Sequence, residues 1–366
     1  MKKNILFFGV LFILPKFNDK ISIGDAMNLY FFLIIILTLI GAKFFVKKYN
    51  YDYLSKKNTS CIKGIFILIV FYSHLVTYTY SIYNKDFIML NFRNFLGQLM
   101  VTMFLFYSGY GVFESIKKKN QNYINLMPKK RILKTWFNFF IAVLSFCILG
   151  FIFNNHFSFG KIILSFIGWE TLGNSNWYIF SIMFMYLLTY FSFKIFDDNH
   201  KKALFLNFIL IIIFILFLRL HKGEYWYNTI FCYYFGMLYS HCKDSIEIIL
   251  FNNLKYIFSL VLSIFVFLIF MVYSKYNFIF YELYSISFVC IIILITMKVQ
   301  INSIILKWFG DNLFWIYILQ RIPMIVFKEV GLSNYVYKYS FVVFVSTIAL
   351  TFIYKFFISK IEKVLF

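Results

Sequence analysis

The sequence predicts an all-α protein, a polytopic bundle of transmembrane helices. Of its 366 residues, 62% are hydrophobic and 24% are aromatic, and only 3 are prolines, a composition unlike that of soluble globular domains. The hydrophobic residues occur in repeated runs, most of them close to the roughly 20 residues that a helix needs to cross a bilayer. Lysines and arginines gather between these runs. These three observations place the chain in a lipid bilayer.

In chain order, the first apolar run extends from Ile5 to Leu14 and is ended by Pro15, and we expect a short first crossing or a re-entrant segment there. The clearer spans are expected at about 26–46, 62–83, 96–115, 133–153, 175–196, 203–219, 227–241, 255–274, 279–298, 312–327 and 339–359. No loop between them is long enough to form a second folded domain.

The distribution of basic residues predicts the topology. If the N-terminus is cytoplasmic and the spans alternate, the cytoplasmic segments hold 25 of the 36 lysines and arginines, as the positive-inside rule requires. We therefore expect a multi-pass protein of the plasma (inner) membrane, with both termini and the 117–134 segment in the cytoplasm. The formal net charge of +21 is explained by topology and by attraction to anionic lipid, so we expect no nucleic-acid partner.

The cysteines do not indicate a metal site or a disulfide framework. None of the five forms a CxxC pair or a Cys/His spacing typical of zinc ligands; they are Cys61, Cys147, Cys232, Cys242 and Cys290. We expect no bound metal.

The residues that carry the most functional information are Lys63 and His74, in the apolar run that begins at Ile62. A histidine inside a membrane helix is costly unless it faces a partner or a wet cavity, so it is a functional candidate. Eleven residues at about 100° each return to within about 20° of the start, so Lys63 and His74 share a helix face, roughly 16 Å apart. This places Lys63 near the membrane surface and His74 near mid-bilayer. A snorkelling lysine and a histidine bonded to a neighbouring helix would give the same pattern.

Further motifs follow in a fixed order. Residues 104–110 read FLFYSGY, a phenylalanine-rich run that ends in Ser-Gly-Tyr. Residues 128–134 read PKKRILK, with Arg131 and Lys134 spaced as i and i+3. Later segments are NWYI at 176–179, YFGML at 234–238 and GDNLFWIYILQ at 310–320.

With these motifs side by side, residues 61–359 resemble the membrane acyltransferase-3 family of bacterial integral-membrane O-acyltransferases. The resemblance implies about ten family helices, so residues 1–60 would add one or two N-terminal membrane helices. Three positions depart from the family pattern: Lys63 and Lys134 replace arginines, and Gln320 replaces a histidine. Lysine lacks the bidentate fork that suits phosphate, and Gln320 cannot act as an acid or a base.

The resemblance implies transfer of an acyl group, here expected to be acetyl, from cytoplasmic acyl-CoA to a hydroxyl of a cell-surface glycan or lipid-linked sugar. Acetyl-CoA would be the donor, and Lys63, Arg131 and Lys134 would hold its phosphates. His74 would be the general base, since its pKa lies near neutrality. Ser108, Trp177 and Gln320 are the candidates for substrate contacts, although Trp177 also suits an aromatic belt and Ser108 suits helix packing.

Two other function classes stay open from the residues alone. A transporter or flippase of lipid-linked oligosaccharide would also have many crossings and basic surfaces, but its usual broken helices and repeated halves are scarce here. A glycan polymerase would call for a long outer loop. The Lys63/His74 face, followed by the Arg131/Lys134 pair, favours the acyl-CoA enzyme.

Overall fold

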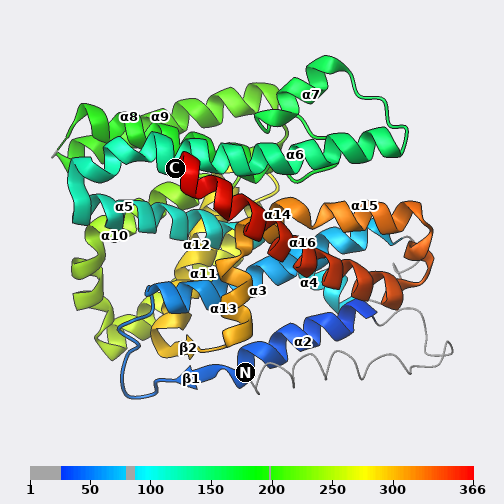
Figure 1. Ribbon diagram of the computed structural model, residues 1–366. Helices are drawn as coiled ribbons and strands as arrows, with labels where there is room; N and C mark the ends of the chain where they lie inside the picture. The colour runs from blue at the N-terminus through cyan, green and yellow to red at the C-terminus, as the bar shows by residue number, and fades with distance from the viewer. Residues whose placement is uncertain (1–25, 80–86, 198) are drawn as a thin grey trace.

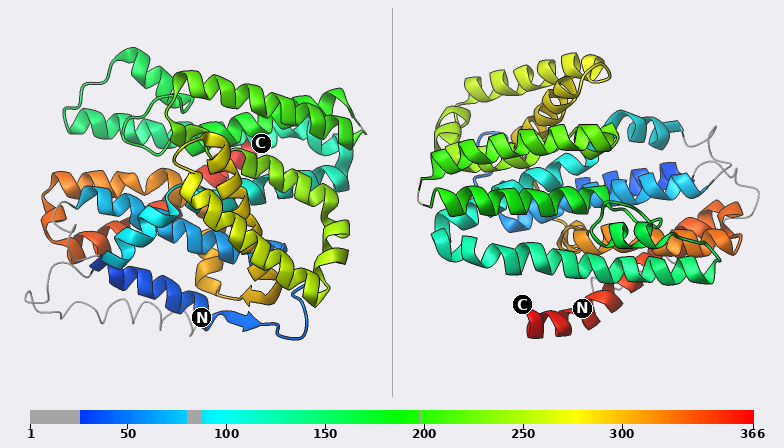
Figure 2. Two further views of the ribbon diagram at one scale, coloured as in Figure 1. Left: turned by 180° about the vertical axis from the view of Figure 1, so that it is seen from behind. Right: turned by 90° about the horizontal axis from the view of Figure 1, so that it is seen from above.

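The computed structural model describes residues 26–79, 87–197 and 199–366, and it confirms the predicted fold class. Nearly all of this backbone is helical, and the described residues contain a single two-stranded sheet. Long helices run alongside one another in a bundle, with the shorter helices between them and at its edges (Figures 1 and 2).

The described elements follow one another with few long connections. The first half contains α2 (Ala26–Ile40), β1 (Ala42–Phe44), α3 (Lys56–Leu75), the 3₁₀ turn η2 (Val76–Tyr78), α4 (Phe87–Leu96), α5 (Leu99–Met127), the π-helical turn η3 (Pro128–Leu133), α6 (Lys134–Ile152) and α7 (Phe159–Phe166). The second half contains α8 (Trp177–Ile195), α9 (His200–His221), η4 (Glu224–Trp226), α10 (Phe231–Leu250), α11 (Asn253–Tyr273), α12 (Phe278–Lys298), β2 (Val299–Ile301), α13 (Ile304–Asp311), α14 (Leu313–Leu319), α15 (Arg321–Glu329), η5 (Leu332–Asn334) and α16 (Val336–Leu365).

Seven stretches of the described residues are long and apolar enough to cross a membrane, which supports the multi-pass assignment. They are Lys56–Tyr78, Leu99–Ile152, Trp177–Ile195, His200–His221, Asn253–Tyr273, Phe278–Lys298 and Val336–Leu365. The expected span at 26–46 is shorter in the structure, because its apolar helix ends at Ile40 and a strand follows. The expected first run, Ile5 to Leu14, lies outside the described residues.

Two sequence-based boundaries were wrong in ways that affect the site. The span expected at 62–83 begins at Lys56, where Ser55 caps the helix by accepting a hydrogen bond from the Asn58 backbone N–H. The single span expected at 312–327 is two helices, α14 and α15, joined at Gln320. Pro323 explains the break, because it has no N–H to donate to the carbonyl four residues earlier.

Helix α3 lies at the centre of the bundle. In its most apolar 18-residue window, 83% of the residues are buried, against 11% in α11, whose side chains face outward. It packs against α2, α5, α13 and α14, so three later segments of the chain surround the helix that carries Lys63 and His74 (Figure 1).

The closest helix pairs meet through glycines on both sides. A methyl group on Gly64 of α3 would overlap the backbone of Leu306 in α13, and one on Gly310 would overlap the backbone of Ser60. In the same way, a methyl group on Gly109 of α5 would overlap the carbonyl of Tyr233 in α10. Small residues let helix backbones approach closely within a membrane, and this explains the glycine of the 104–110 motif as a packing residue.

The basic segments of the described chain meet at one end of the bundle. Strand β1 pairs antiparallel with β2, and the Tyr49 hydroxyl lies 2.9 Å from Asn253 Oδ1. Lys194 Nζ lies 2.7 Å from Asn125 Oδ1, and Lys134 Nζ lies 3.1 Å from Glu362 Oε2. Segments that the alternating topology assigns to one side of the membrane are therefore neighbours.

We predict that Gly109→Ala lowers the thermal unfolding midpoint of the purified protein, because the added methyl group must push α5 and α10 apart. Overpacking of this kind costs about 1–3 kcal/mol. The matched control is Gly111→Ala in the same helix, where nothing lies within 4 Å of the new methyl group. That control should be neutral or slightly stabilising. Equal midpoints for the two variants would contradict the close approach.

Candidate functional site

His74 lies in the last turn of α3, closer to the end of the membrane stretch than the sequence suggested. The helix begins six residues before the expected span, so His74 lies near its C-terminal end. The mid-bilayer placement of His74 stays a prediction. Val76 follows as the C-cap, and Thr77 Oγ1 donates a hydrogen bond to the His74 carbonyl at 2.6 Å. This turn fixes the backbone from which the imidazole extends.

The side chain next to the imidazole is Gln320, at the junction of α14 and α15. Its Nε2 lies 3.0 Å from His74 Nδ1 and 3.2 Å from the carbonyl oxygen of Tyr317. Gln320 is fully buried, and its Oε1 has no hydrogen-bond partner among the described residues. The structure thus brings together two residues, His74 and Gln320, that the sequence placed 246 positions apart.

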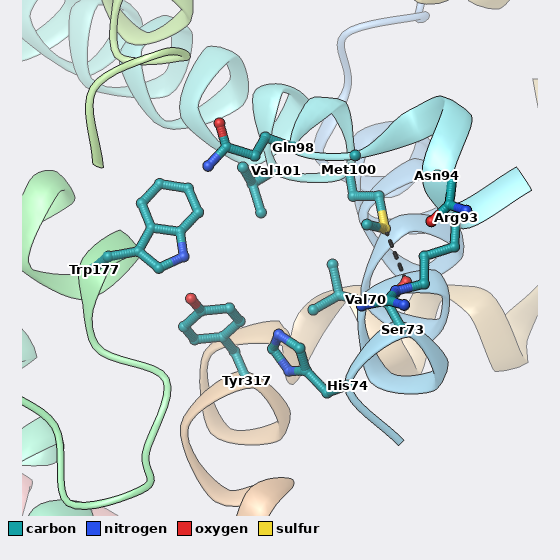
Figure 3. A pocket seen from close by; sticks show the side chains of 11 residues that line it. Val70, Ser73, His74, Arg93, Asn94, Gln98, Met100, Val101, Trp177 and Tyr317 are labelled. Carbon is teal, nitrogen blue, oxygen red and sulfur yellow. Dashed lines mark hydrogen bonds between the residues drawn. The ribbon is translucent and has the colours of Figure 1, made fainter. Parts of the chain in front are cut away.

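A cavity of about 360 Å³ opens beside this pair. In Figure 3, the side chains of His74, Tyr317 and Trp177 extend toward the same space. The rest of its lining comes from α3 and from the region of α4 and α5, and includes Val70, Ser73, Arg93, Asn94, Gly97, Gln98, Met100 and Val101. Polar and aromatic groups around a concave site of this size are typical of a small-ligand pocket.

Hydrogen bonds within the loop before α8 fix the position of Trp177, the first residue of that helix. Asn176, the N-cap, donates from Nδ2 to the carbonyls of Gly168 and Glu170, at 2.9 and 3.0 Å. Trp177 therefore lines the cavity beside His74. Its role as a substrate contact stays a prediction.

Of the described residues, the two charged side chains that face His74 are cations. Arg93 of α4 lines the cavity, and Arg321 of α15 donates from Nε to Ser175 Oγ at 3.0 Å. The cavity lining contains no carboxylate within the described chain. Arg93, Arg321 and Tyr317 were not predicted as site residues from the sequence, although an arginine close to an apolar run is itself a sign of function.

Ser108 does not line the cavity. It lies next to Tyr178 of α8. The Tyr178 ring centroid lies 5.3 Å from that of Tyr317, and the Tyr317 ring in turn lies 6.4 Å from the imidazole of His74. Ser108 therefore reaches the site only through two tyrosines.

Arg131 and Lys134 face different neighbours. Arg131 Nε donates to the Tyr123 hydroxyl at 2.9 Å, and its guanidinium lies 6.0 Å from the ring centroid of Tyr186. Lys134 instead pairs with Glu362 of α16. Their i and i+3 spacing does not give them the same neighbours, because Arg131 lies in the π-helical turn η3, which is wider than an α-turn.

Lys63 lies near Asp311. The Asp311 carboxylate accepts hydrogen bonds from Ser60 Oγ and from Lys307 Nζ, each at 2.6 Å. Burial alone would raise the pKa of the Asp311 carboxyl, but the hydrogen bonds from Lys307 and Ser60 and the charges of Lys307 and Lys63 lower that pKa below its usual value. Asp311 is thus a carboxylate that partly compensates Lys63. Among the described residues, no hydrogen bond or ion pair joins Lys63, Arg131 and Lys134 to one another.

The described residues contain no group of three His, Cys, Asp or Glu side chains arranged to hold a metal ion.

Comparisons with known proteins place the chain in a family. No curated protein and no solved structure matches it. The model of the acyltransferase-3 family, described as an acyltransferase domain, matches residues 58–358, which is most of the chain. The chain therefore belongs to the acyltransferase-3 family and is a multi-pass membrane enzyme that transfers acyl groups other than aminoacyl groups.

Proposed function

We propose that this acyltransferase moves an acetyl group from cytoplasmic acetyl-CoA to a hydroxyl of a cell-surface glycan or lipid-linked saccharide. The observation that carries the proposal is the cavity beside His74, inside a membrane enzyme of this family. We place the enzyme in the plasma (inner) membrane with both termini in the cytoplasm. The clustering of the basic segments at one end of the bundle supports this orientation.

His74 acts in this proposal as the general base. Because Nδ1 faces Gln320, Nε2 is the ring nitrogen left for the substrate. As the acceptor oxygen bonds to the thioester carbon, its proton passes to Nε2, the carbon–sulfur bond breaks, and the CoA thiolate leaves and takes up the proton. A positioned base contributes about 10²–10⁴-fold to the rate.

The donor reaches His74 from the basic end of the bundle. Arg131 is the principal phosphate ligand, and Lys63 and Lys134 complete the cationic set, each beside a carboxylate that offsets part of its charge. Tyr186, next to Arg131, and Tyr178, next to Tyr317, lie eight residues apart on α8, about 12 Å along the helix. In this proposal, the donor lies along α8, with its phosphates near Tyr186 and its thioester carbonyl toward Tyr178.

The cations beside His74 favour an acceptor that carries negative charge near the reacting hydroxyl. Arg93 lines the cavity and Arg321 faces the imidazole, so an acidic sugar or a saccharide phosphate would be attracted there. Trp177 offers an aromatic surface to the sugar ring, and Gln320 contributes through its contact with His74.

We predict that replacing Arg131 with alanine weakens acetyl-CoA binding about tenfold or more, because a hydrogen bond to a charged phosphate is worth about 1.5–3 kcal/mol. Lys63→Ala and Lys134→Ala should have smaller effects in the same direction. The measurement is acetyl-CoA affinity in sealed membrane vesicles of both orientations, with binding expected only when the 117–134 segment faces the donor.

The matched control for these variants is Lys130→Ala, which removes an exposed cation from the same turn. Unchanged donor affinity in all three test variants would show that these cations determine membrane topology and do not bind the donor. Binding from the opposite face would overturn the orientation.

We predict that His74→Ala keeps near-normal acetyl-CoA affinity while glycan acetylation falls by about 10² or more. His74→Gln keeps similar size and hydrogen bonding but has no base, so it should fail equally. The measurement is ester-linked acetyl on the surface glycans of cells that carry each variant.

The control is His156→Gln, which changes an exposed histidine away from the cavity and should acetylate normally. A purely structural histidine would give the reverse pattern, with glutamine restoring function and alanine lowering stability. Normal acetylation by His74→Gln would therefore disprove the general-base role.

A further inference from the structure

The orientation of the Gln320 amide can be assigned from its neighbours. The Tyr317 carbonyl, 3.2 Å from the amide nitrogen, can only accept a hydrogen bond, so it requires the NH₂ end of the amide. Turning the amide by 180° would place two carbonyl oxygens against each other. It would also move the NH₂ group to the buried position where Oε1 has no partner. Two lost donors cost more than one unpaired acceptor, so the arrangement of the structure is the favoured one.

This orientation determines which nitrogen of His74 carries hydrogen. The same NH₂ group lies 3.0 Å from His74 Nδ1, and a donor at that distance requires Nδ1 to accept. A neutral imidazole has one N–H, so its hydrogen must then be on Nε2. In this state the nitrogen left for the substrate is a hydrogen-bond donor, able to polarise a thioester carbonyl but unable to take a proton.

We propose that Gln320 is a positioning residue that holds resting His74 with its hydrogen on Nε2, and that the Gln320 amide must turn over before His74 can act as a base. The proposal rests on the function proposed above, because it concerns the state of the same histidine. Conversion requires Nε2 to lose a proton and Nδ1 to gain one, which exchange with water through the imidazolium supplies. The Oε1 that is unpaired at rest then accepts the hydrogen bond from Nδ1–H.

The surroundings of His74 make Gln320 the residue that can support this change. Tyr317 of α14 packs beside the ring, and the charged groups of the described chain that face it, Arg93 and Arg321, are donors only. No carboxylate is hydrogen-bonded to His74 among the described residues. Glutamine carries both a donor and an acceptor, so a single rotation changes what it offers to Nδ1.

The test is nitrogen-15 NMR of the full-length protein in lipid, with label only in histidine. The chain has 5 histidines, and the signals of residue 74 are those that disappear in His74→Gln. The expected wild-type result is a protonated Nε2 and a bare Nδ1. A protonated Nδ1 in the resting wild-type protein would overturn the proposal directly, whatever the folding of any variant.

Gln320→Glu provides the second arm, because a carboxylate offers only acceptors to Nδ1. It should move the hydrogen from Nε2 to Nδ1 and raise the rate of acetylation, because no rotation of an amide is then needed. Gln320→Met offers no partner and should lower that rate by up to about tenfold, the loss of one orienting hydrogen bond. Gln121→Glu is the matched control, since Gln121 bonds to the Phe193 carbonyl and does not line the cavity.

An unchanged His74 spectrum in Gln320→Glu would also overturn the proposal. The NMR signature does not depend on acyl transfer, whereas the general-base role is read from acetylation by the His74 variants. Failure of one can therefore be distinguished from failure of the other.

Discussion

The close approach of α3 and α13 is the constraint on which the rest of the site depends. Within a bilayer, lipid is as apolar as the helix surfaces, so helices are held by packing and hydrogen bonds. Gly64 and Gly310 allow the two backbones to touch, and the hydrogen bond from Ser60 to Asp311 joins them again at the same level. Helix α14 follows directly and ends at Gln320, beside His74. Packing near one end of α3 thus positions Gln320 beside His74 at its other end.

Much of the bundle could be predicted from the sequence, because apolar length and basic segments are properties of single stretches of chain. The site is different, since it depends on which stretches meet. His74 could be chosen as an intramembrane histidine, but its contact with Gln320 depends on how α14 packs against α3. Arg93 went unnoticed because α4 is only ten residues long and was not expected as a helix. The separation of Arg131 from Lys134 depends on a π-helical turn, which has no clear sequence signal.

The charged and polar groups of the two regions differ. At the basic end, Lys63 and Lys134 have carboxylate neighbours, whereas Arg131 donates a hydrogen bond to the Tyr123 hydroxyl. At the other end, the cavity is lined by Arg93, by aromatic rings and by the imidazole of His74. Membership of the acyltransferase-3 family supports an enzyme that transfers acyl groups rather than a transporter.

Mass analysis of surface glycans from cells with and without the protein is the most direct test of the proposed acetyl transfer. We expect that one glycan or lipid-linked saccharide carries ester-linked acetyl groups only when the protein is present. The amount of that saccharide at the cell surface should stay the same. Unchanged acetylation, together with loss of the saccharide from the surface, would contradict the account and would indicate a transporter.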